Sequence, residues 1–313
     1  MRLSLFDDYD ISNITVKVKP FIKWAGGKTQ IIEEIDKRLP PELKSGKPMR
    51  YIEPFVGSGA LLFHLLNNYN IKHAYIVDIN KDLINLYLVI KEKVAELIDL
   101  LSKIESEYKK LSEEKKKEYY YSKRDEYNKE NTEKVKKAAL LIFLNKTCYN
   151  GLYRTNKKGE FNVPYGKYEN PKILDEENLI AVSKKLNNVE IFCGDFEISK
   201  NFPLDEETLI YFDPPYRPIS RTSNFTFYSP NEFNDKEQIR LKMFFDYVTA
   251  KGAKAILSNS DPKNVNPNDN FFDELYKGYI IERIFAKRSI NSDKEKRGYI
   301  REILIRNYKN YLF

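Results

Sequence analysis

Short apolar runs alternate with amphipathic stretches along most of the chain. The clearest run is residues 209–212, Leu-Ile-Tyr-Phe, where aliphatic and aromatic residues predict a buried strand. Strands that alternate with helices predict an α/β domain with a mainly parallel sheet. A polar connection too short for a crossover helix joins the last two strands, which we expect to be antiparallel. The other predicted strands are residues 50–54, 74–77, 189–196, 253–261, 279–285 and 302–308, and the helices beside them are 29–39, 60–68, 175–186 and 235–250.

The middle of the chain has a different pattern. From about residue 82 to 144 it predicts charged amphipathic helices. Residues 145–171 then carry tyrosines and basic residues on both sides of Asn-Lys-Lys-Gly, a hairpin turn signal. Such a ribbon fits the major groove of DNA, although an ordinary surface hairpin has the same turn. We therefore expect a catalytic domain at 20–84 and 181–313, a recognition domain at 85–180, and a loosely held extension at 1–19.

Composition narrows the class of protein. The 313 residues are 42% hydrophobic and 14% aromatic, which excludes wholesale disorder, and the net charge of +7 favours a polyanionic partner. Two Cys and two His argue against disulfides and against a zinc site, so we expect no metal. Neither a signal-type segment nor a run of about 18 apolar residues is present. A soluble cytoplasmic protein without membrane contact is the expectation.

A glycine loop follows the strand at 50–54. The loop, Phe-Val-Gly-Ser-Gly at 55–59, precedes a helix, and the next strand ends at Asp78. This is the nucleotide-binding arrangement in which an acid holds ribose hydroxyls, so we count Gly57, Gly59 and Asp78 as cofactor-binding residues. The third glycine of the dinucleotide fingerprint is missing. A nucleoside ligand without phosphates, such as S-adenosylmethionine, is therefore favoured over a pyrophosphate.

The sequence Asp213-Pro214-Pro215-Tyr216 ends the strand at 209–212. Two prolines stop the strand and make a rigid bend, which delivers a carboxylate, a carbonyl and an aromatic ring to the sheet edge. Those groups suit a planar amine such as adenine. A strand that merely ends in a Pro-Pro turn is the alternative on these four residues alone.

Taken together, these motifs resemble those of the Dam-like (alpha-class, D12) DNA adenine N6-methyltransferases, over essentially the whole chain after residue 19. The resemblance rests on residues 23–28 (Lys-Trp-Ala-Gly-Gly-Lys), 53–59, 78–80, the hairpin at 149–168, and 213–216. It implies a Rossmann-like S-adenosylmethionine-dependent methyltransferase sheet, mainly parallel with an antiparallel last strand, and an inserted helical and β-hairpin DNA-recognition domain. The extension at 1–19 and the long charged helices near 105–130 depart from the family pattern.

The resemblance also implies roles for single residues. S-adenosylmethionine would be bound by Trp24, Lys28, Asp78 and Asp213, with Phe55, Gly57, Ile79, Asp195 and Phe196 lining its pocket. Duplex DNA would meet Tyr149 and Asn150 at the flipped base, Leu152, Arg154 and Pro164 at other bases, Lys167 and Tyr168 at the backbone, and Ser220 and Asn224 in a following loop.

The reaction that we expect is methyl transfer to N6 of adenine, in GATC. Asp213 and the Pro214 carbonyl would accept hydrogen bonds from the amine, Pro215 would keep the bend rigid, and Tyr216 would stack on the flipped base. The alternatives are cytosine N4 methylation, methylation of RNA or of a protein glutamine amide, and a non-catalytic DNA-binding protein. A monomer acting on double-stranded DNA, with or without a cognate restriction endonuclease, is the expected assembly.

Overall fold

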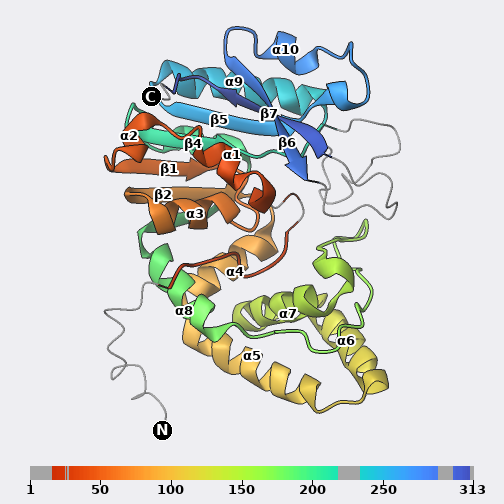
Figure 1. The fold of residues 1–313 in the computed structure, drawn as a ribbon. Coiled ribbons are helices and arrows are strands. Elements are labelled where there is room, and N and C mark those ends of the chain that lie inside the picture. The colour runs from red at the N-terminus through yellow and green to blue at the C-terminus, as the bar shows by residue number, and fades with distance from the viewer. Residues whose placement is uncertain (1–15, 25, 27, 218–232, 288–298, 311–313) are drawn as a thin grey trace.

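The computed structural model describes residues 16–24, 26, 28–217, 233–287 and 299–310. Its centre is a seven-stranded sheet in the order β3-β2-β1-β4-β5-β7-β6 (Figure 1). The first five strands in this order are parallel, and β7 is antiparallel to both of its neighbours, which confirms the predicted antiparallel pairing at the end of the chain. The strands are β1 (Met49–Glu53), β2 (Ile71–Asp78), β3 (Val189–Cys193), β4 (Thr208–Phe212), β5 (Lys254–Ser260), β6 (Ile280–Lys287) and β7 (Tyr299–Arg306).

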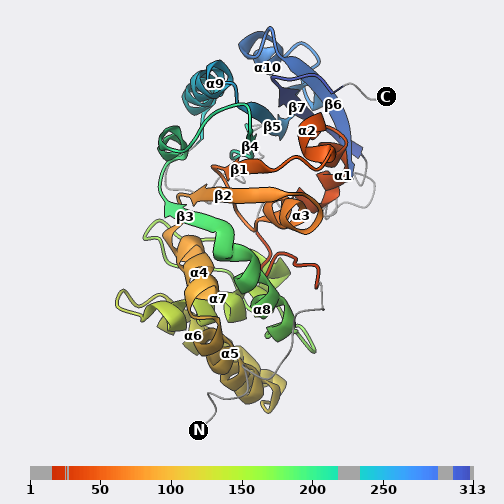
Figure 2. The same cartoon turned by 90° about the vertical axis from the view of Figure 1, so that its left-hand side faces the viewer.

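Helices cover both faces of this sheet (Figure 2). Because successive side chains of a strand point to opposite faces, Tyr211 belongs to one core while Ile210 and Phe212 belong to the other. The longer helices are α3 (Ala60–Asn68), α4 (Lys81–Glu92), α5 (Val94–Lys109), α6 (Glu113–Tyr127), α7 (Lys134–Thr147), α8 (Glu176–Lys185) and α9 (Asp235–Ala250). The shorter ones are η1 (Lys28–Gln30), α1 (Ile32–Asp36), α2 (Pro41–Lys44), η2 (Tyr149–Gly151), η3 (Leu186–Asn188), η4 (Phe196–Asn201), η5 (Pro262–Asn264) and α10 (Phe271–Leu275).

The helices α5, α6 and α7 form a separate group below the sheet in Figure 1, joined to it through α4 and α8. The helix α4 contacts β3 on one side and α7 on the other. The core on that face of the sheet consequently continues into the helical group. In the described part of the chain, no helix has both the length and the apolar character needed to cross a membrane.

The predicted hairpin is present in part. The turn forms as expected, since Gly159 adopts a φ of +80° and the Asn156 side chain accepts hydrogen bonds from the backbone N–H groups of residues 158 and 160. Its arms meet in two isolated antiparallel bridges instead of a continuous ladder. Pro164 lacks an N–H group and Asn150 has a φ of +57°, and neither suits an extended ladder.

Three asparagines hold the segment that leads into the sheet. The amide of Asn67 donates to the backbone oxygen of residue 18 and accepts from its N–H, at 2.8 and 3.1 Å. Asn178 binds the backbone of Lys19 in the same way, and Asn145 that of Lys23. The expectation that the extension is loosely held up to Lys19 is therefore wrong at its end, where Val18 is also buried.

Candidate active site

Four neighbouring strands end at one edge of the sheet and bring the predicted site residues to it. In the order β3, β2, β1 and β4, the residues at or just after these ends are Asp195, Asp78, Glu53 and Asp213. Parallel strands place their carboxyl ends on the same edge, which is where open α/β sheets bind ligands. The predicted cofactor and catalytic carboxylates therefore share one edge.

The glycine loop closes against Asp78. The N–H of Gly57 donates to Oδ2 of Asp78 at 3.1 Å, and the N–H of Asn80 donates to Oδ1 at 2.9 Å. Burial raises the pKa of Asp78 although these backbone hydrogen bonds act in the opposite direction. Gly59 has a φ of +70° and precedes α3, and a side chain there would lie 2.6 Å from the hydroxyl of Tyr87. The exposed Ile79, with 57% of its surface accessible, projects beside this loop.

The only tryptophan forms one wall of the loop. A side chain at Gly57 would lie 3.1 Å from Cδ1 of Trp24, so the glycine permits close contact with the indole. The other face of Trp24 stacks on Tyr153, with ring centroids 4.7 Å apart and planes 24° apart. Tyr153 belongs to the hairpin arm and is buried. The hairpin thus contributes a contact to Trp24, a predicted cofactor-binding residue, through a tyrosine that the sequence did not single out.

Phe55 in the glycine loop and Phe196 after β3 form a second aromatic group near this edge. The Phe55 and Phe196 rings lie 5.4 Å apart. The carboxylate of Asp195 accepts two hydrogen bonds from Arg240, at 2.8 and 2.7 Å, and the guanidinium also lies over the Phe196 ring. The Arg240 hydrogen bonds hold the pKa of Asp195 below its usual range. This acid is therefore ionised and fixed in place.

Asp213 lies in a mostly buried ion pair. Its Oδ1 is 2.9 Å from Nζ of Lys28 and accepts a hydrogen bond from the Ser258 hydroxyl at 3.1 Å. Burial, opposed by Lys28 and Ser258 and assisted by Glu302, raises the pKa of Asp213 to about 6. Lys28, predicted among the cofactor-binding residues, here contacts Asp213 and Tyr216 of the turn that was predicted to be catalytic. An acid with a pKa near neutrality in a ligand-binding edge is typical of a functional site.

The Tyr216 side chain is held at its hydroxyl and over the face of its ring. Its hydroxyl donates to Oε2 of Glu302 on β7 at 2.6 Å, and the ammonium of Lys28 lies 4.0 Å from the ring centroid. Glu53, between the Asp78 and Asp213 strands, is buried, and that burial raises its pKa well above the usual value. Asp213, which pairs with Lys28, thus has two further acids near it, Glu53 and Glu302.

The predicted DNA-binding residues of the hairpin lie on both of its arms, and Tyr153, which stacks on Trp24, belongs to the first arm. Tyr149 is 55% exposed, and the Arg154 guanidinium is held by the side chain and carbonyl of Asn162 at 2.7 and 3.2 Å. Lys167 adopts a φ of +54°, in the left-handed region that few residues other than glycine adopt. Asn150, Pro164 and Lys167 are exposed, Leu152 and Tyr168 half-buried, and Ser220 and Asn224 fall outside the described residues.

Sequence reasoning missed four residues in or beside the site: Tyr153, Ser258, Glu302, and Arg217, which directly follows Tyr216 and donates its N–H to Asn259. Ser258 lies in a predicted strand beside β4, one residue after the partner of Phe212, so the parallel register of the two strands places it next to Asp213. The other three had no local signal, because their partners come from distant segments. Among the residues that the structure describes, no group of three or more His, Cys, Asp or Glu is arranged to hold a metal ion.

Comparison with known proteins gives consistent matches. A family model described as D12 class N6 adenine-specific DNA methyltransferase matches residues 24–290. The chain is 54% identical over 297 residues to the Type II methyltransferase M.MjaIII of Methanocaldococcus jannaschii, with 94% of this chain and 100% of the relative covered. It is 38% identical over 297 residues to the Type II methyltransferase M1.LlaDCHI of Lactococcus lactis subsp. cremoris, covering 94% and 97%. It is 32% identical over 288 residues to the DNA adenine methylase of Escherichia coli K12, covering 92% and 95%.

Proposed function

Because the chain belongs to the D12 class of N6 adenine-specific DNA methyltransferases, we propose that it methylates adenine in GATC, with the turn at residues 213–216 as its catalytic centre. One observation carries the proposal. The buried Asp213 carboxylate and the Tyr216 ring lie at the same sheet edge as the glycine loop and Asp78. The edge can therefore hold a nucleoside cofactor and a flipped base side by side.

The residues present fit S-adenosylmethionine. Gly57 lets a ligand approach the backbone, Asp78 offers a carboxylate for ribose hydroxyls, and Trp24 and Ile79 supply apolar surface for an adenine ring. When bound, S-adenosylmethionine supplies an electrophilic methyl group on a sulfonium. The Phe55 and Phe196 wall beside Asp195 completes the proposed pocket, with Arg240 keeping Asp195 ionised.

The chain's own part in the reaction is to orient the amine of adenine. In its ionised form, Asp213 accepts a hydrogen bond from one N–H of the amine, and the Pro214 carbonyl accepts the other. The two acceptors would draw the nitrogen lone pair out of the ring plane, toward a methyl carbon presented in line. Formation of the N–C bond would break the C–S bond of the sulfonium and release S-adenosylhomocysteine, and the nitrogen would lose one proton to water, so no covalent enzyme intermediate is needed. Tyr216 stacks on the extruded base. The Lys28 ammonium, which lies over the same ring, gives up that contact as the base enters. Alignment of the reactants supplies much of the acceleration.

The hairpin arm supplies the contacts with DNA in this proposal. Arg154 is held in a fixed orientation by Asn162, as a side chain that reads a base edge in the major groove must be. Tyr149 stands exposed where the duplex approaches, beside Asn150. The division of the chain at 84/85 and 180/181 is part of the same proposal, as are a monomeric assembly and a cognate restriction endonuclease that cuts unmethylated sites.

Methyl transfer to defined duplexes tests the function. Duplexes with one GATC and matched duplexes with each base pair changed singly are incubated with labelled S-adenosylmethionine, and the nucleosides are separated by mass spectrometry. We expect N6-methyladenine only in GATC, and protection of the product from an endonuclease that cuts that site. N4-methylcytosine would refute adenine as the target, and N6-methyladenine in another tetranucleotide would refute the recognition assignment alone.

A further inference from the structure

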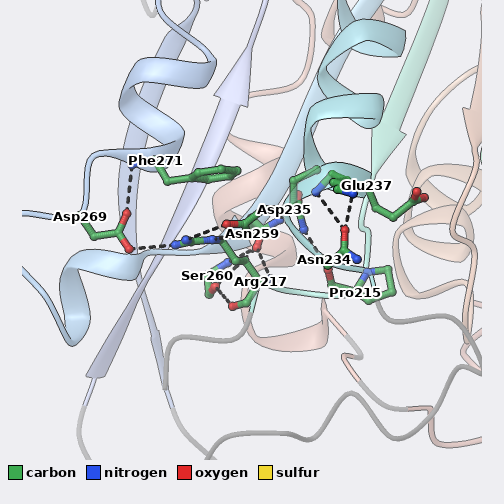
Figure 3. A network of polar contacts seen from close by, with 11 residues as sticks. Pro215, Arg217, Asn234, Asp235, Glu237, Asn259, Ser260, Asp269 and Phe271 are labelled. Atoms are coloured by element: carbon green, nitrogen blue, oxygen red, sulfur yellow. Dashed lines mark hydrogen bonds and ion pairs between the residues drawn. The ribbon is translucent and has the colours of Figure 1, made fainter. Parts of the chain in front are cut away.

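Arg217 follows the Asp-Pro-Pro-Tyr turn directly, and its side chain bridges two acids (Figure 3). Its Nε donates to Oδ1 of Asp235 at 2.7 Å and its Nη2 to Oδ2 at 3.2 Å, while Nη1 donates to Asp269 at 2.8 Å. The Phe271 ring lies 4.3 Å from the guanidinium carbon. A planar fork with several fixed donors makes these contacts, whereas a lysine ammonium would reach only one acid well.

The backbone of Arg217 is also held, by β5. Its N–H donates to the side-chain oxygen of Asn259 at 3.1 Å, and its carbonyl accepts from the Ser260 hydroxyl at 2.9 Å. The residue before these two is Ser258, which donates to Asp213. Three consecutive residues of β5 thus bind the beginning and the end of the catalytic turn.

A third set of contacts joins the turn to α9. The buried Gln238 donates to the Pro215 carbonyl at 3.3 Å and accepts from the Asn259 amide at 3.2 Å. Gln238 lies about one helical turn after Asp235, the partner of Arg217. The start of α9 is fixed by Asn234, whose side chain accepts from two backbone N–H groups (Figure 3). The guanidinium therefore anchors the turn to a rigid helix end.

We propose that Arg217 is a positioning residue for methyl transfer, which sets the orientation of the Asp213 carboxylate and the Tyr216 ring by fixing the exit of the turn to Asp235 and Asp269. The inference rests on the proposed role of that turn. Both acids keep part of their surface in water, and ion pairs of that kind add little to global stability. A small misalignment of reacting groups, in contrast, can slow an enzyme about a hundredfold. The main effect of Arg217 is therefore on rate.

Steady-state kinetics test this with the full-length chain and a duplex substrate. For Arg217→Ala we expect kcat to fall about tenfold or more, with KM for the duplex and for S-adenosylmethionine within about twofold of wild type. Arg217→Lys should recover part of the rate. Asp269→Asn should lower kcat as well, although it lies on the loop before α10, away from the reacting groups. The Arg217→Ala/Asp269→Asn double variant should be no slower than Arg217→Ala alone.

The control is Asp246→Asn, at the other end of α9, where the carboxylate binds Lys242 and Tyr279. We expect its kcat to equal that of wild type. The inference falls if Arg217→Ala and Asp269→Asn both keep the wild-type kcat, or if their losses match a loss of folded protein by circular dichroism. If Asp213→Ala remains active in the same assay, the proposed function fails instead. An inactive Asp213→Ala beside a fully active Arg217→Ala overturns only the role of Arg217.

Discussion

Replacing Asp213 with Asn removes a buried charge and keeps the shape of the side chain. The structure sets the size of the effect, because the pKa of Asp213 rises from an ordinary 3.8 to about 6 in the folded chain. At 1.36 kcal/mol for each pH unit, the ionised carboxylate costs the folded state about 3 kcal/mol. Lys28 and Ser258 already reduce that cost, and burial is its main cause.

The pH dependence of this contribution follows from the difference between the folded and unfolded pKa values of Asp213. A folded pKa above the unfolded one means that the folded state holds the proton more tightly, so this contribution to stability is fully present below pH 3.8 and is lost as the pH rises through about 6. The Asn variant has no such titration. The unfolding free energy of wild type minus that of Asp213→Asn should therefore fall by about 2 kcal/mol between about pH 4.5 and 7.5.

Urea unfolding of both proteins at several pH values and constant ionic strength measures this difference. The matched control is Asp195→Asn, because Arg240 lowers the pKa of Asp195 and its contribution is lost as the pH falls. The control difference should consequently stay nearly constant between about pH 4.5 and 7.5 and fall only at more acidic pH. A wild-type minus Asp213→Asn difference that is flat across the range, or that rises with pH, would refute the assignment of a raised pKa.

Two further predictions concern neighbours of that turn. Lys28→Met removes the cation that favours the ionised form of Asp213. The acidic limb of the kcat/KM–pH profile should therefore move from about pH 6 to a pH about one unit or more higher. An unmoved limb would exclude Lys28 as the charge that sets the pKa of Asp213. Tyr153→Ala removes the ring stacked on Trp24, so S-adenosylmethionine should bind about three- to tenfold more weakly by calorimetry. Tyr153→Phe keeps the ring and should bind S-adenosylmethionine as wild type does. Equal affinities of the three proteins would contradict a role for the stacked rings.

The strands and the glycine loop were predictable because their signals are local. Helix α3 occupies residues 60–68 and α9 occupies 235–250 as predicted, since the apolar period marks both, and Asn234 also caps the start of α9. The stretch at 29–39 instead divides into η1 and the short α1. The apolar spacing of this stretch does follow a helical period, but only the five residues of α1 form an α-helix before Pro40.

The contacts that orient the site were not predictable in the same way. The Arg217 guanidinium binds acids from the start of α9 and from the loop before α10. Tyr216 binds Glu302 on β7, the strand that pairs antiparallel with β5. No period or motif joins such distant positions. The hairpin shows the reverse case, because its turn chemistry was correct while its ladder is broken by Pro164 and by the left-handed Asn150.

Three asparagine clamps, Asn67, Asn145 and Asn178, hold the backbone of residues 18–23 and make the chain sensitive to deamidation. Each clamp presents one donor and one acceptor to a single backbone residue, so deamidation would exchange an N–H for an oxygen that faces a carbonyl. At Asn145 this one-atom change would also break the bond to the Gly151 carbonyl and so loosen, at once, the approach to Trp24 and the base of the hairpin. Hydrolysis of this single buried amide would therefore loosen the link between the segment before Trp24 and the start of the hairpin.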